Sequence, residues 1–161
     1  MRHSFKLGFG FGSTSGVITT LGLMTSLHSS THSKTAVIGG ILAIAIADAF
    51  SDALGMHISV EAGNRHTTKE VWEATMATFF SKFIIALSFI LPVLFFSLGV
   101  AVIINIIWGL LLISLVSFFI AMAQREKPHK IILEHLFITV LVIIITHYIG
   151  NWIAAFSNLK V

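Results

Sequence analysis

The sequence predicts an all-α integral membrane protein, with five transmembrane helices in one domain over residues 1–161. Two observations predict this fold class. Hydrophobic residues make up 56% of the chain and charged residues only 11%, whereas soluble domains carry about a quarter charged residues. The chain also contains five mostly apolar stretches, each of at least the roughly 20 residues that cross a bilayer. Because there is no cysteine, disulfides and thiolate metal sites are excluded.

The five segments expected to form membrane-spanning helices are residues 7–27, 35–60, 74–96, 98–122 and 131–156. The first is rich in Gly, Ser and Thr, and a position at the membrane surface would reduce the number of crossings to four. Its polarity comes from small residues and not from charge, which favours a crossing. Pro92 is expected to kink or end the third helix, and a tight turn is expected near Gly99.

The distribution of basic residues predicts the orientation. With five crossings, the N-terminus shares a side with the links at 61–73 and 123–130. That side carries seven basic residues, which are Arg2, Lys6, Arg65, Lys69, Arg125, Lys127 and Lys130. The other side carries only Lys34 and Lys160. The positive-inside rule therefore predicts a cytoplasmic N-terminus and a C-terminus outside. The membrane is expected to be the plasma membrane of a prokaryote, or an organelle membrane in a eukaryote.

Two acids lie inside the second segment, in the stretch "IADAFSDALGMH". At 1.5 Å per residue, Asp48 and Asp52 lie roughly 18 Å and roughly 12 Å from the cytoplasmic end, within the hydrocarbon. Ionisable residues at such depths mark ion sites and pathways. On a helix they form one stripe with Met56 and Ser59, while His57 points away. Two carboxylates and a thioether suit Fe²⁺ or Mn²⁺ better than Ca²⁺ or Mg²⁺, so Asp48, Asp52 and Met56 are the candidate metal ligands.

Lys82 offers a second interpretation of the acids. It lies about 12 Å from the cytoplasmic end of the third segment, at the depth of Asp52. An ion pair between the two explains both residues without a ligand, although it leaves Asp48 without an obvious partner. The two interpretations can coexist, because an arriving cation can displace the lysine. Lys82 is therefore a candidate for charge coupling, and Glu61 and His147 are candidates for proton coupling.

The first segment carries small and hydroxyl side chains. Gly8, Gly12 and Gly16 are spaced by four residues, a pattern typical of close helix packing, either within a subunit or across a dimer. The hydroxyl groups nearby either bond to carbonyls of their own helix or line a polar pathway. Thr14 and Ser15 are the pathway candidates on this helix, and Ser59 is the pathway candidate on the second.

The stretches "FGSTSGVITTLGLM" and "SDALGMHISVEAGNR" resemble the vacuolar iron transporter family. The resemblance implies five helices with a cytoplasmic N-terminus, and a homodimer that exports or sequesters Fe²⁺ and Mn²⁺ from the cytoplasm in exchange for protons. It also implies that the metal passes between the first helices of the two subunits.

The chain departs from the family pattern at three positions. Ser15 stands where the family has an aspartate, Asp52 where it has the transport methionine, and Met56 where it has an acid. The link "EAGNRHTTKEVWE" is too short for the cytoplasmic metal-binding domain of some members. The chain therefore resembles a divergent member that lacks this domain.

The expected function is a transporter that moves Fe²⁺ or Mn²⁺ out of the cytoplasm, with the bilayer and a second copy of the chain as partners. The alternative is a non-transporting membrane subunit, in which the acids pair with Lys82 and the glycine face docks a partner. The sequence contains no nucleophile–base arrangement, no phosphate-binding loop and no HExxH motif. An enzyme, a permanently bound cofactor and a nucleic-acid partner are therefore not expected.

Overall fold

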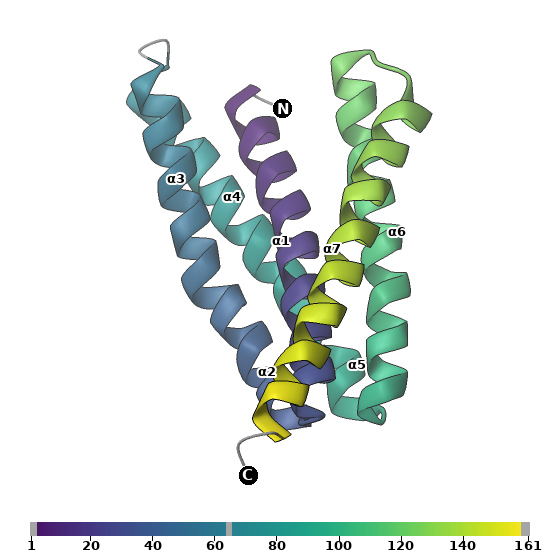
Figure 1. Cartoon of the computed structure of the whole chain (residues 1–161). Coiled ribbons are helices and arrows are strands. Elements are labelled where there is room, and N and C mark those ends of the chain that lie inside the picture. The colour runs from purple at the N-terminus through teal and green to yellow at the C-terminus, as the bar shows by residue number, and fades with distance from the viewer. Residues whose placement is uncertain (1–2, 64–65, 159–161) are drawn as a thin grey trace.

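The structure, a computed structural model, describes residues 3–63 and 66–158, and this part of the chain is helical throughout apart from short links (Figure 1). The helices are α1 (His3–Thr31), α2 (Lys34–Ala43), the π-helical turn η1 (Ile44–Asp48), α3 (Ala49–Ala62), α4 (Thr68–Ser88), α5 (Ile90–Phe95), α6 (Leu98–Gln124) and α7 (Pro128–Asn158).

These elements form five spans that are long and apolar enough to cross a membrane. Three are the single helices α1, α6 and α7. The other two are composite, with α2, η1 and α3 forming the span Lys34–Ala62, and α4 and α5 forming the span Thr68–Phe95. The all-α class and the number of long helices are therefore confirmed. Large apolar side chains such as Phe50, Ile84 and Phe95 are exposed on the outside of the bundle.

The links between the spans alternate between the two ends of the bundle. Figure 1 shows the start of α1, the α3–α4 link and the α6–α7 link at one end, with the end of α7 at the other. Lys6, Lys69, Arg125, Lys127 and Lys130 belong to the first end, while Arg2, Arg65 and Lys160 lie outside the described residues. At the opposite end, the Lys34 ammonium donates hydrogen bonds to the carbonyls of Leu94 and Phe96.

Helix α1 is the most buried of the five spans and packs between α4 and α7 (Figure 1). Its glycines allow the contact with α4. A Cβ atom at Gly12 would lie 2.9 Å from Thr78 Cα, and one at Gly16 would lie 3.2 Å from Lys82 Cα. Thr78 Oγ1 also donates a hydrogen bond to the Gly8 carbonyl, at 3.2 Å. The glycine face therefore packs against another helix of the same chain.

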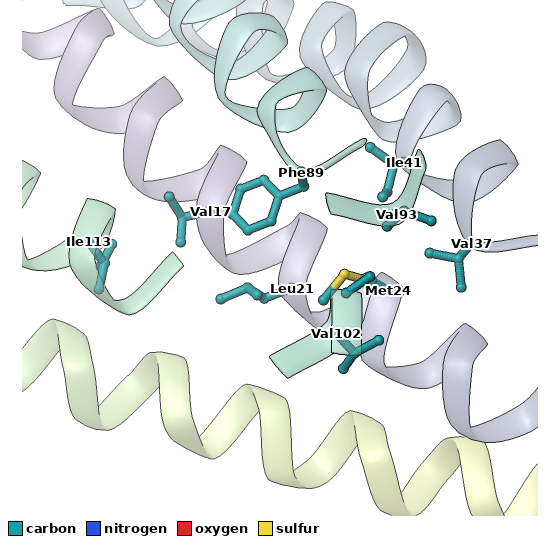
Figure 2. Close-up of a cluster of buried hydrophobic side chains, with 10 residues drawn as sticks. Val17, Leu21, Met24, Val37, Ile41, Phe89, Val93, Val102 and Ile113 are labelled. Carbon is teal, nitrogen blue, oxygen red and sulfur yellow. The ribbon is translucent and has the colours of Figure 1, made fainter. Parts of the chain in front are cut away.

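The main apolar core lies beside α1, toward the end where α7 finishes. Figure 2 shows side chains from α1, α2, α5 and α6 converging there, together with Phe89 from the α4–α5 junction. The cluster consists of Val17, Leu21, Met24, Val37, Ile41, Phe89, Val93, Ala101, Val102 and Ile113.

The break between α4 and α5 lies at Phe89, three residues before Pro92. Proline has no N–H to donate and its ring clashes with the carbonyl four residues earlier, so the helix cannot continue regularly. The side chain of Asn105, on α6, donates a hydrogen bond to the Phe89 carbonyl at 2.9 Å. The kink expected near Pro92 is confirmed. The sequence did not indicate that Asn105 donates a hydrogen bond to the backbone carbonyl at this break.

The sequence predicted one regular α-helix over residues 35–60. The structure differs, because the second span is interrupted. Residues Ile44–Asp48 form a π-helical turn, which ends at the first of the two acids. A π turn contains one more residue than an α turn, so it shifts the face on which the following residues lie. The segment contains neither Gly nor Pro, and no sequence signal marks the turn.

Candidate functional site

Four polar side chains from three spans meet in the middle of the bundle. Lys82 Nζ lies 2.6 Å from Asp48 Oδ2 and 2.5 Å from Asp52 Oδ2, and it donates a hydrogen bond of 2.9 Å to Ser15 Oγ. Ser15 in turn donates to Asp52 Oδ2 at 2.6 Å. We call Ser15, Asp48, Asp52 and Lys82 the carboxylate–lysine cluster.

The cluster is buried unevenly. The Lys82 side chain has no exposed surface, whereas 35% of the Asp48 side chain and 20% of the Asp52 side chain are exposed. Asp48 lies at the midpoint of the span Lys34–Ala62, and Lys82 lies near the midpoint of the span Thr68–Phe95. Two carboxylates face one ammonium, so the cluster carries one surplus negative charge when all three groups are ionised.

Local structure explains why these side chains meet. Asp48 and Asp52 are four residues apart, so they lie on one face of the second span. The close contact at Gly16 brings the α4 backbone at Lys82 against α1. From there the long lysine stem reaches Ser15, the residue before Gly16, as well as both carboxylates. The glycine packing of α1 therefore positions the lysine.

The expectation that Asp48 has no partner is wrong, because it contacts Lys82 as closely as Asp52 does. Helix lengths give the depth of a residue in the bundle but not the direction in which its side chain points. The comparison of depths therefore identified the Lys82–Asp52 pair, because the two residues lie at the same depth. It missed Asp48, which lies farther from the cytoplasmic end of its helix.

Other predicted site residues lie outside the cluster. Met56 packs with Val60, Val71 and Ala74 where α3 meets α4, so the expected stripe of acids and thioether is divided between two environments. Ser59 is exposed. Thr14 donates its hydroxyl hydrogen to the Gly10 carbonyl at 2.7 Å, as hydroxyl side chains inside helices commonly do.

Glu61 lies at the end of α3, beyond the cluster. It is exposed, and its carboxylate lies 4.0 Å from His57 Nε2. A hollow at this end of the bundle is lined by His57, Glu61, His66, Thr68 and Val71. His57 also shares a hydrogen bond of 3.0 Å with Thr75 Oγ1, so it faces α4 at a level beyond the acids.

His147 lies at the opposite end of the bundle. Its Nδ1 atom is 2.6 Å from Ser29 Oγ, near the end of α1, and its Nε2 atom is 3.1 Å from Asn151 Nδ2. Ser29 is nearly four helical turns from Ser15, so the structure does not bring His147 to the carboxylate–lysine cluster.

A row of small residues on the second span was missed in the sequence. It recurs at every fourth position, and each member is exposed. The row consists of Gly39, Ala43, Ala47, Ser51, Gly55 and Ser59. A Cβ atom at Gly39 or Gly55 would meet no other atom within 4 Å. Ser51 and Gly55 lie three residues after Asp48 and Asp52, so this open face adjoins the exposed sides of both acids.

No family model, curated protein or solved structure matches this chain. Within residues 3–63 and 66–158, no three His, Asp or Glu side chains are grouped so that they could hold a metal ion. The carboxylate–lysine cluster instead offers two carboxylates and one hydroxyl, and all three oxygen-bearing groups are directed at the lysine ammonium.

Proposed function

We propose that this chain is a membrane transporter that moves a divalent transition-metal cation, Mn²⁺ or Fe²⁺, out of the cytoplasm in exchange for protons. The N-terminus is cytoplasmic in this proposal, and the working unit is a homodimer. The observation that carries it is the surplus carboxylate at the middle of the spans, with both acids partly exposed beside a fully buried lysine.

The charge of the cluster favours a cation site over a purely structural ion pair. One acid is enough to neutralise Lys82. A second acid leaves an unbalanced charge, which costs several kcal/mol in the hydrocarbon region unless it is hydrated, paired or bound to a cation. The side chains of Asp48 and Asp52 are partly exposed, whereas Lys82 is fully buried, so the acids form the accessible part of the cluster.

The ligand chemistry favours Mn²⁺ of the two ions. The groups in contact around Lys82 are carboxylate and hydroxyl oxygens, which suit Mn²⁺. The Met56 side chain packs elsewhere, among Val60, Val71 and Ala74. The thioether argument for Fe²⁺ therefore carries less weight than the oxygen ligands do.

The exposed row of small residues supports the homodimer. Small side chains let two helices approach closely in a membrane, where lipid provides no hydrophobic drive for association. A second copy packed on the face of Ser51 and Gly55 would cover the exposed acids and supply further oxygen ligands. Helix α1 is enclosed between α4 and α7, so we place the cation path beside the second span and not between two copies of α1.

The proposed orientation in the membrane and the proposed exchange of metal for protons rest on the sequence. The excess of Lys and Arg at the end of the bundle where α1 begins supports its cytoplasmic location. The resemblance to vacuolar iron transporters supports export of the metal and exchange for protons.

A second candidate function has one observation in its favour. Lys82 contacts both Asp48 and Asp52, which is what a structural polar cluster in a non-transporting membrane subunit requires. In that case the exposed acids would be covered by a different protein. The two functions differ in whether cations cross the membrane.

Flux into sealed vesicles tests the proposal. The purified chain is reconstituted into liposomes that contain a trapped dye quenched by Mn²⁺, with an outward proton gradient. Native protein is expected to accelerate quenching in proportion to its amount. The triple variant Asp48→Asn/Asp52→Asn/Lys82→Met keeps the side-chain volumes and removes every charge of the cluster, so it is expected to fall to the rate of empty liposomes.

A triple variant that transports Mn²⁺ as fast as native protein would show that the cluster is only structural. Folded native protein that moves neither Mn²⁺ nor Fe²⁺, with or without the proton gradient, would favour the non-transporting subunit. Gly55→Leu adds a test of the homodimer, because it obstructs the proposed interface at a position with open space in the single chain.

A further inference from the structure

We infer that the Lys82 ammonium competes with the substrate cation for the carboxylates of Asp48 and Asp52. This competition makes the site selective for divalent over monovalent ions. The inference rests on the proposed function, since it concerns the same two carboxylates. Its basis is the position of the Lys82 ammonium, which lies between Asp48, Asp52 and Ser15 at the place that a bound cation would take.

The Lys82 ammonium is surrounded by oxygen atoms in the way that a bound metal ion is surrounded by its ligands. A lysine has three N–H donors, and oxygen atoms of three side chains lie within 2.9 Å of its nitrogen. These groups come from α1, from the end of η1 and from α3. Without substrate, the lysine therefore compensates one of the two negative charges, and a metal ion can approach the same oxygens only when the ammonium leaves.

The backbone around Lys82 restricts how it can leave. A Cβ atom at Gly16 would lie 3.2 Å from Lys82 Cα and 3.3 Å from its carbonyl oxygen, and one at Gly12 would lie 2.9 Å from Thr78 Cα. Helix α4 is thus in direct backbone contact with α1 on this side. Release of the ammonium is therefore a rotation of the flexible four-carbon stem, with α4 remaining in place.

Charge determines which ions can displace the lysine. A monovalent ion carries the same charge as the ammonium, so the exchange gives no electrostatic gain and leaves the ammonium unpaired inside the bundle. A divalent ion doubles the attraction to the same two carboxylates. Lys82 therefore weakens the binding of every cation, and it reduces the binding of monovalent ions to a negligible level.

The test measures Mn²⁺ affinity with and without the lysine. The full-length chain in detergent is titrated with Mn²⁺ at fixed pH, free Mn²⁺ is followed by its electron paramagnetic resonance signal, and the titration is repeated in excess K⁺. Lys82→Met is expected to lower the apparent Kd by about tenfold or more, because a site occupied by its own lysine is available for only a small fraction of the time. Excess K⁺ should weaken Mn²⁺ binding in this variant and not in native protein.

Lys69→Met is the matched control, since it makes the same substitution at an exposed position near the start of α4. It is expected to change neither the apparent Kd nor the response to K⁺. If Lys82→Met does not unfold cooperatively, Lys82→Met/Asp48→Asn replaces it, because that variant keeps the net charge of the native cluster. Competition by K⁺ is expected there too, and its absence would overturn the inference.

The outcomes separate this inference from the proposed function. If native protein binds Mn²⁺ and folded Lys82→Met binds it no more tightly, with no response to K⁺, Lys82 is structural and only the inference fails. If neither folded protein binds Mn²⁺, the proposed function fails as well. Tighter binding without the lysine is a result that a structural role does not produce, because loss of a structural ion pair would weaken the site.

Discussion

Replacing Gly12 with leucine is expected to prevent α1 from packing against α4 and to destabilise the folded chain by about 3 kcal/mol or more. The added side chain would meet the Thr78 backbone and the Ser81 hydroxyl. Backbone atoms cannot rotate away as side-chain atoms can, so the cost lies at the upper end for overpacked sites. The measurement is thermal unfolding in detergent, followed by circular dichroism.

Gly99→Leu is the control for this prediction. Gly99 is exposed, and a Cβ atom there would meet nothing within 4 Å, so the same substitution should leave unfolding unchanged. The glycine face contacts α4 of its own chain, and the expected effect is therefore loss of folded protein and not dissociation of a well-folded dimer. A Gly12→Leu protein that unfolds like the native one would contradict the packing described here.

Removing both acids is expected to have the second large effect. Asp48→Asn/Asp52→Asn leaves the buried Lys82 ammonium without a counter-charge and should destabilise the chain by about 3–5 kcal/mol, the range measured when one side of a buried ion pair is removed. Either single substitution should cost much less, because the remaining acid still contacts Lys82. The set is compared by thermal unfolding without metal.

Adding Lys82→Met to the double variant is expected to restore stability close to the native value, because it removes the unpaired charge and keeps an apolar side chain of similar length. The difference expected between the single and double acid substitutions depends on an ion pair between Asp48 and Lys82. If Asp52→Asn alone destabilises as much as the double substitution, Asp48 does not share the ammonium, and the cluster reduces to one ion pair.

Much of the fold follows from segment length and composition. A stretch of apolar residues long enough to cross a bilayer has few stable conformations other than a helix. Each expected segment coincides with one of the five spans, although the third, 74–96, extends one residue beyond the end of its span at Phe95. The kink also follows from chemistry, because Pro92 cannot continue a regular helix. The π turn at Ile44–Asp48 does not follow, since its Ile, Ala and Asp residues fit an α-helix equally well.

The candidate site was predicted only in part. The depth of Lys82 correctly pointed to Asp52, because residues on adjacent helices at one depth can meet. The directions in which side chains point around each helix could not be deduced from depth. For this reason the Lys82–Asp48 contact and the separate position of Met56 were missed. The glycines of α1 indicated a close backbone approach, but such a pattern does not say which helix approaches.

Binding of a metal ion by the two acids can be observed in an anomalous-scattering map of crystals soaked in Mn²⁺. A peak is expected between the carboxylates of Asp48 and Asp52, with the Lys82 ammonium displaced from its position between them. Crystals of Asp48→Asn/Asp52→Asn/Lys82→Met, soaked in the same way, should lack this peak. A map of native protein at saturating Mn²⁺ with no peak at the acids, and with Lys82 still in contact with both, would contradict metal binding by the carboxylate–lysine cluster.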